Sequence, residues 1–116
     1  MDHRKDARFS VQFRSSFSSV NSVLGAGILE DLSIRGCRIF SRTTVKSGTE
    51  IELHIEVSPE KSPIHIQRAV VRWARDEIFG LEFMNLANNE WARLREIVHE
   101  LGKESGPQEK REDSAA

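Results

Sequence analysis

Two arginines four residues apart near the N-terminus are the first side chains whose chemistry suggests a ligand. Arg4 and Arg8 stand just before the first alternating apolar segment of the 116-residue chain. A guanidinium group is a planar, permanently charged fork that binds phosphate bidentately and stacks on a purine ring. Four extended residues span at most about 14 Å, whereas one helical turn brings two Cβ atoms to about 5–6 Å. The pair can therefore close around an anion, although the spacing alone is more typical of a solvated charge cluster.

A second polar motif is the hexapeptide Asp-Leu-Ser-Ile-Arg-Gly at residues 31–36. In extended backbone Asp31 and Ser33 share one face, so we expect carboxylate and hydroxyl to be displayed together outside the core. A carboxylate accepts two donors from the Watson–Crick edge of guanine, and a serine hydroxyl can bind phosphate. Gly36 would allow a positive φ or the close approach of a ligand, and Arg35 adds a cation within the motif. Taken alone, the hexapeptide is more typical of a hairpin corner.

The other candidate residues are weaker. Trp73 could border a guanine, but a tryptophan in an apolar strand is more often part of the core, and we interpret it so. Four histidines are scattered along the chain: His3, His54, His65 and His99. None forms the paired spacing of a zinc site, so we expect no bound metal. Catalytic signatures such as a Gly-x-Ser-x-Gly elbow or a phosphate-binding Gly-x-x-x-x-Gly-Lys loop are absent from the sequence, and we expect no enzyme activity.

Six short segments would have to position these residues. Residues 9–17 and 50–57 alternate apolar and polar side chains, which predicts half-buried strands. Further strands are expected at 28–32, 37–40, 64–73 and 79–83. The expected turns or bulges are Asn21-Ser22, Gly25-Ala26-Gly27, Lys46-Ser47-Gly48, Ser58 to Pro63 and Asp76-Glu77. Antiparallel strands joined by close turns predict an all-β barrel or sandwich, because closing the sheet removes exposed edges.

A helix and a polar tail complete the expected organisation. Asn88 or Asn89 can cap the helix. Its apolar stripe, which should pack on the barrel, repeats at helical spacing: Trp91, Leu94, Ile97, Val98 and Leu101. Residues 102–116 are charged, contain proline and lack large apolar side chains, so we predict a disordered tail. The chain thus divides into an arm (1–8), a barrel with its helix (9–101) and the tail.

Composition and net charge limit the kinds of partner that the chain is expected to bind. Apolar residues make up 38% of the chain and charged residues 30%, as in a single globular domain. The 17 basic and 18 acidic side chains give a net charge of −1, so no global field favours nucleic acid or an anionic membrane. A single cysteine, Cys37, excludes an internal disulfide. The sequence lacks a secretion signal, and we expect a cytoplasmic protein.

Together and in this order, the two motifs resemble those of the PilZ domain family. The family pattern is Arg-x-x-x-Arg before the first barrel strand, followed in the next strand pair by Asp or Asn, any residue, Ser, two residues and Gly. Arg4 and Arg8 match the first element. Asp31, Ser33 and Gly36 match the second.

The resemblance covers residues 4 to about 101, including the late hairpin segments 70–73 and 79–83 and the helix. It implies a six-stranded antiparallel PilZ-type β-barrel, with a C-terminal helix packed on it, that binds the second messenger cyclic di-GMP. One departure is His3, where many members have a further arginine. A ligand held as a monomer and one held as an intercalated dimer are both open.

The resemblance also implies roles for the motif residues. Arg4 and Arg8 would contact the phosphates and the guanine faces. Asp31 and Ser33 would bind the opposite side of the nucleotide, and Gly36 would leave space beside the backbone. Ordering of the N-terminal arm on binding would alter contacts with a downstream protein partner. The alternative is a PilZ-like interaction module that binds no nucleotide. A barrel for single-stranded nucleic acid is disfavoured by the balanced charge and the absence of tyrosine.

Overall fold

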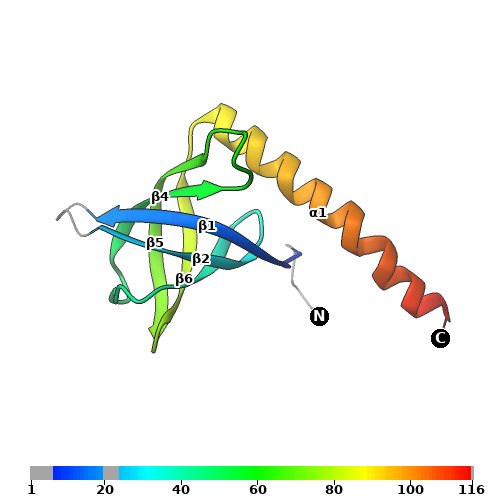
Figure 1. The fold of residues 1–116 in the computed structure, drawn as a ribbon, viewed down its shortest axis with the longest axis horizontal. Coiled ribbons are helices and arrows are strands. Elements are labelled where there is room, and N and C mark those ends of the chain that lie inside the picture. Colours follow the sequence, from blue (N-terminus) through cyan, green and yellow to red (C-terminus); the bar gives the residue numbers. More distant parts are fainter. Residues whose placement is uncertain (1–6, 20–23, 116) are drawn as a thin grey trace.

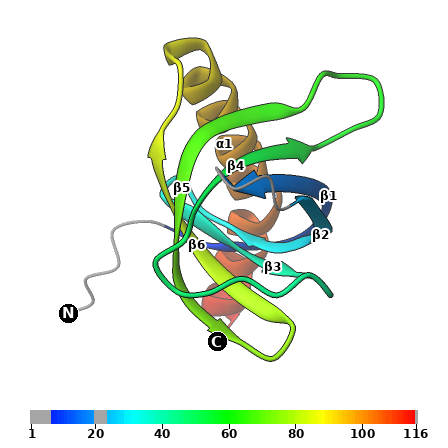
Figure 2. The same cartoon turned by 90° about the vertical axis from the view of Figure 1, so that its left-hand side faces the viewer.

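Six antiparallel strands pair in the order β1-β2-β3-β6-β5-β4, and β4 pairs with β1 to close a barrel (Figures 1 and 2). This computed structural model describes residues 7–19 and 24–115, with side chains described as far as Lys103. The elements are β1 (Phe9–Ser19), β2 (Leu24–Leu32), β3 (Gly36–Phe40), β4 (Glu50–Glu56), β5 (Ile64–Arg75), β6 (Ile78–Asn85) and α1 (Asn88–Ala115). The predicted all-β barrel with one C-terminal helix is confirmed.

The barrel interior is filled by the apolar residues of the alternating strands. In β4, Ile51, Leu53 and Ile55 are buried. Across the interior, the rings of Phe17 and Phe79 meet edge to face with their centroids 5.4 Å apart. Burial of each large side chain contributes roughly 1.5–3 kcal/mol, so this core stabilises the closed sheet. The intervening positions point outward and are available to form a site.

Strand β2 begins earlier than the sequence indicated. The glycines of Gly25-Ala26-Gly27 were expected in a turn or bulge, but they lie inside the strand. A Cβ at Gly27 would lie 2.4 Å from the carbonyl oxygen of Phe40, so the glycine permits close packing of neighbouring backbones. The expected Asn21-Ser22 turn lies outside the described residues. The Asp76-Glu77 turn is confirmed, with Asp76 at a φ of 55°.

Helix α1 packs on the outside of the barrel through the predicted stripe. Leu94 is fully buried, and the other members are partly buried against the core: Trp91, Ile97, Val98 and Leu101. The helix begins at Asn88, but neither Asn88 nor Asn89 occupies the cap position. The carbonyl of Ala87 accepts hydrogen bonds from the amides of Glu90 and Trp91, each at 2.9 Å, so Ala87 is the N-cap.

The C-terminal part of α1 extends beyond the barrel (Figure 1). Its backbone is helical to Ala115, whereas the sequence predicted a disordered tail over residues 102–116. Side chains beyond Lys103 lie outside the described residues. The predicted disorder of residues 102–116 therefore stays a prediction. No helix within the described part of the chain is long and apolar enough to span a bilayer.

Candidate ligand-binding site

The strand register aligns five outward-facing positions in one row across five strands. Ser10 of β1 pairs with Asp31 of β2, and Asp31 pairs with Arg38 of β3. Arg38 pairs in turn with Gly80 of β6, which pairs with Trp73 of β5. Directly paired residues place their side chains on the same face of a sheet. The row therefore gathers a carboxylate, a guanidinium group and an indole on the outer wall of the barrel.

A cavity of about 310 Å³ opens beside this row. Its lining combines three arginines and one carboxylate with apolar and small residues: Arg8, Asp31, Cys37, Arg38, Arg72, Trp73, Gly80 and Leu81. The volume lies in the range of small-molecule sites, roughly 300–1,000 Å³. Each arginine also pairs with a carboxylate, Arg38 with Glu30 and Arg72 with Glu82, so the lining offers guanidinium groups to a ligand without a large excess of positive charge.

Arg8 and Asp31, which belong to different sequence motifs, are in direct contact. The Nε of Arg8 donates a hydrogen bond to Oδ1 of Asp31 at 3.0 Å. On the other side, Nη1 of Arg38 lies 4.0 Å from Oδ2 of the same carboxylate. The side chain of Asp31 is 19% exposed and that of Arg8 is 46% exposed, so a ligand can reach both. Arg4, the other arginine of the first motif, lies outside the described residues.

Ser33 does not face outward beside Asp31, and that expectation is wrong. Ser33 is completely buried, because the chain turns immediately after β2 and the strict alternation ends. Its Oγ accepts hydrogen bonds from the amides of Arg35 and Gly36, both at 3.2 Å. The Ser33 amide donates to the carbonyl of Gly36 at 2.9 Å. Ser33 thus holds the turn between β2 and β3, while Arg35 lies exposed on it.

Gly36 has a different backbone role from the two that the sequence suggested. Among the described residues only Asp76 and Gly48 have positive φ angles, so Gly36 is not required for a left-handed conformation. A Cβ at Gly36 would instead lie 2.2 Å from the carbonyl oxygen of Leu81. The glycine therefore allows close approach of β3 to β6, not of a ligand to the turn.

Trp73 is part of the cavity and not of the core, so its interpretation as a core residue is wrong. Its surface is 41% exposed, and a Cβ added at Gly80 would lie 2.3 Å from its Nε1. The indole thus lies over the glycine backbone, with the guanidinium carbon of Arg75 5.9 Å from the ring centroid. The two-residue turn at Asp76-Glu77 pairs Trp73 with Gly80, and this pairing is the sequence signal that could have revealed the arrangement.

Two further arginines were underestimated from the sequence. Arg38 and Arg72 line the cavity, although neither belongs to the two sequence motifs. Nε of Arg72 donates to Oε1 of Glu82 at 2.6 Å, which fixes its guanidinium group beside Trp73. Arg35, the arginine favoured from the sequence, does not line this cavity. Which arginines line the cavity depends on the strand register, and a linear motif does not contain that information.

Cys37 contributes an apolar surface to the cavity. Burial strongly raises the pKa of its thiol; the positive charge of Arg8 lowers it and the Asp31 carboxylate raises it, both to a smaller extent. The thiol therefore stays protonated at neutral pH and is a poor nucleophile. Cys37 is thus a small buried residue of the core.

A larger groove of about 630 Å³ lies elsewhere on the barrel. Ile28 and Phe40, each 38% exposed, contribute apolar surface to it, and Arg14 and Arg42 contribute charge. Among the described residues, none from the two sequence motifs lines this groove. The smaller cavity is therefore the better candidate for a specific polar ligand, because it joins oppositely charged groups from both motifs.

An antiparallel barrel that carries an arginine-lined cavity on its outer wall has the form of a small ligand-binding domain. The sequence pattern of the PilZ domain family matches residues 2–100, so the chain belongs to this family. PilZ domains are non-catalytic receptor domains, and the chain is therefore a receptor domain and not an enzyme. No curated protein sequence is significantly similar to the chain.

Solved structures share the fold at low sequence identity. The PilZ domain of YcgR from Escherichia coli with c-di-GMP matches with a TM-score of 0.73 and 14% identity, over 94% of this chain and 98% of that one. MotI/DgrA, an inhibitor of motility from Bacillus subtilis, gives 0.67 and 17% over 86% of this chain and 51% of that one. The PilZ domain of CeSA from a cellulose-synthesizing bacterium gives 0.65 and 13%, over 82% and 97%.

Proposed function

We propose that the chain is a receptor for cyclic di-GMP and that the cavity beside Arg8 and Asp31 holds the nucleotide. The observation that carries the proposal is the 3.0 Å contact between these two side chains, which come from motifs 23 positions apart in the sequence. Cyclic di-GMP carries two phosphates and two guanines. A site for it needs cations, an acceptor for the guanine edge and a flat surface for stacking, and this cavity offers all three.

Each residue has a proposed role. Arg8, with Arg4 from the N-terminal arm, binds phosphate oxygens and covers a guanine face, while Asp31 accepts hydrogen bonds from the guanine edge. Trp73 supplies a stacking surface on the opposite wall, since it is exposed and held over Gly80. Ser33 and Gly36 act by fixing the turn that positions Asp31. Arg35, exposed on that turn, is proposed to reach an outer phosphate.

Binding would exchange one ion pair for several stronger contacts. The Arg8–Asp31 pair is partly exposed, and such pairs contribute only about 0.2–1 kcal/mol. Hydrogen bonds between charged groups and a ligand contribute roughly 1.5–3 kcal/mol each, so opening the pair is offset when both partners bind nucleotide. The N-terminal arm then becomes ordered against the barrel. We propose that a downstream protein in the cytoplasm recognises this changed surface.

Calorimetric titration of the purified chain with cyclic di-GMP tests the function directly. We expect saturable binding of cyclic di-GMP and at least tenfold weaker binding of cyclic di-AMP and GTP. Adenine lacks the two edge donors that guanine offers to Asp31, and GTP has only one nucleoside to occupy the site. In a parallel titration followed by NMR, the amide signals of residues 3–9 and 31–36 should shift. Equal affinities for all three nucleotides would contradict the proposal, and the measured stoichiometry would separate a monomer from an intercalated dimer.

One observation favours a second function, a protein-interaction module that binds no nucleotide. The charges of Arg8 and Asp31 already satisfy each other, so this surface is stable without an anion. The absence of any calorimetric or NMR response to cyclic di-GMP would support this second function.

The Asp31→Ala variant tests the proposal that the Asp31 carboxylate recognises guanine. We expect it to lose at least tenfold in affinity for cyclic di-GMP while its weak affinity for cyclic di-AMP changes little, because the carboxylate pairs only with the guanine edge. Parallel titrations of both nucleotides measure the ratio. Glu60→Ala, which removes an exposed carboxylate from the loop between β4 and β5, is the matched control. An equal loss for both nucleotides would instead assign Asp31 a structural role.

A further inference from the structure

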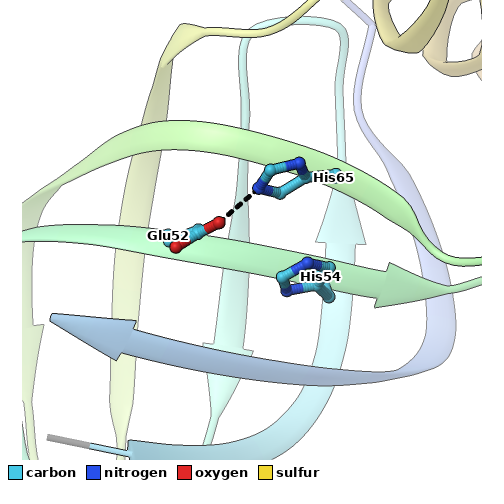
Figure 3. A group of neighbouring side chains, drawn as sticks. All are labelled: Glu52, His54 and His65. Atoms are coloured by element: carbon cyan, nitrogen blue, oxygen red, sulfur yellow. Dashed lines mark hydrogen bonds and ion pairs between the residues drawn. The ribbon is translucent and has the colours of Figure 1, made fainter. Parts of the chain in front are cut away.

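Two histidines and a glutamate gather on the outer face of β4 and β5 (Figure 3). His54 and His65 are directly paired residues of these strands, and their rings stack with centroids 4.5 Å apart and an interplanar angle of 3°. Oε2 of Glu52 lies 2.5 Å from Nε2 of His65. One potential ligand atom from each of the three residues lies within 4.8 Å of the others. None of the three lines the cavity beside Arg8.

Strand pairing explains why the cluster is hidden in the linear sequence. The expectation of no bound metal rested on the wide spacing of the histidines along the chain. Glu52 and His54 are two residues apart on one strand and therefore share a face. The loop after β4 returns the chain antiparallel, so that His65 becomes the partner of His54. A spacing too wide for a helical or turn-based zinc motif thus becomes a contact across two strands.

The donor atoms define the class of ion. Imidazole nitrogen suits Zn²⁺, Cu²⁺ and Ni²⁺, whereas Mg²⁺ and Ca²⁺ prefer sites made of oxygen ligands. Zinc binds His nitrogen at about 2.0–2.1 Å and carboxylate oxygen at about 2.0–2.2 Å, so the ligand atoms of a tetrahedral site lie roughly 3.3 Å apart. The broad final torsions of His and Glu allow the ligand atoms to move from within 4.8 Å to that separation. Two nitrogens and one oxygen leave a fourth position for water.

The surroundings fix the backbone of the cluster but leave its side chains accessible. The main-chain amide of His65 donates to Oε1 of Glu90 at 3.1 Å, which ties the start of β5 to the first turn of α1. Glu90 also accepts a hydrogen bond from Nη1 of Arg93 at 3.3 Å. The side chains of His65 and Glu52 are 34% and 47% exposed, so an ion can enter from solvent. Because the ligands lie on adjacent strands of a closed barrel, metal binding requires their side chains to rotate but requires no change in strand pairing.

We propose that Glu52, His54 and His65 form a binding site for one Zn²⁺ ion. The ion would replace the hydrogen bond between Glu52 and His65 and would join β4 to β5 through three ligands. Because the pairing that forms the site exists only in the folded chain, zinc binding also stabilises the barrel.

Calorimetric titration of the full chain, after removal of metal with a chelator, tests the site. We expect one Zn²⁺ to bind per chain and Mg²⁺ not to bind. His54→Gln and His65→Gln should each weaken zinc binding at least tenfold, since each removes one of three protein ligands, and each should reduce the rise in Tm that zinc produces in the parent chain. His99→Gln is the matched control, because His99 lies exposed on α1 and outside the cluster.

Three results would overturn the proposal: no zinc binding by the parent chain, unchanged affinity in both cluster variants, or an equal loss in His99→Gln. Imidazole nitrogen NMR of the unmodified chain provides a readout that does not depend on the variants. Zinc should move the signals of His54 and His65 and leave that of His99 in place. Movement of the His99 signal alone would also refute the site.

Discussion

Replacement of Arg8 by alanine is expected to weaken cyclic di-GMP binding by about ten- to a hundredfold. The variant loses the charge-assisted hydrogen bonds proposed for this guanidinium group, which contribute roughly 1.5–3 kcal/mol. It also leaves Asp31 without the partner that now lies 3.0 Å away. The fold should persist, because Arg8 precedes β1 and its side chain is 46% exposed. Calorimetry gives the change in affinity, and circular dichroism checks the fold.

Two further variants serve as comparisons for Arg8→Ala. Arg8→Lys keeps the positive charge but loses the planar fork, so we expect its affinity to lie between those of the parent and Arg8→Ala. Arg14→Ala removes another arginine, one that lines the larger groove, and should leave binding unchanged. If Arg8→Ala binds cyclic di-GMP as tightly as the parent does, Arg8 does not contact the ligand.

Gly36→Ala is expected to lower the free energy of unfolding by about 1–3 kcal/mol, the usual cost of forcing an extra group into a packed position. The new Cβ would lie 2.2 Å from the carbonyl oxygen of Leu81. Because that oxygen belongs to the backbone of β6, β3 and β6 must separate and weaken their ladder. Urea denaturation followed by tryptophan fluorescence measures the change.

Gly102→Ala provides the control for the glycine prediction. Gly102 lies in α1, and a Cβ there would have its nearest neighbour, Cζ of Phe9, at an ordinary 3.6 Å. Alanine in a helix is about 0.5–1 kcal/mol more favourable than glycine, so this variant should be as stable as the parent or more stable. A Gly36→Ala variant with the stability of the parent would show that β3 and β6 have room to adjust.

The sequence predicted the main elements because their patterns are local. The alternation in β4 and the helical repeat around Leu94 each follow from the period of a single element, and both apolar faces are buried as expected. The boundaries were less accurate. The glycines before Ile28 were expected in a turn because glycine is common there, but close packing beside Phe40 places them inside β2.

The candidate site was predicted in part, and what the sequence missed depends on contacts between strands. Asp31 and Arg8 were identified from their motifs, and the structure brings them together. Ser33 was expected to face outward because extended backbone was assumed through the turn, where the chain in fact buries its hydroxyl. Trp73 and Arg38 enter the site through their pairing with Gly80, which is a property of the assembled sheet and not of a short motif.

The row from Ser10 to Trp73 crosses five of the six strands, and this has a consequence for the life of the protein in a cell. Its members lie between residues 10 and 80 of the chain and become neighbours only when β1, β2, β3, β6 and β5 have paired. In the proposed function, a copy in which β5 and β6 have not paired with β3 lacks the Trp73 side of the cavity and should bind cyclic di-GMP weakly. Competence to bind the nucleotide would then be acquired together with this part of the sheet.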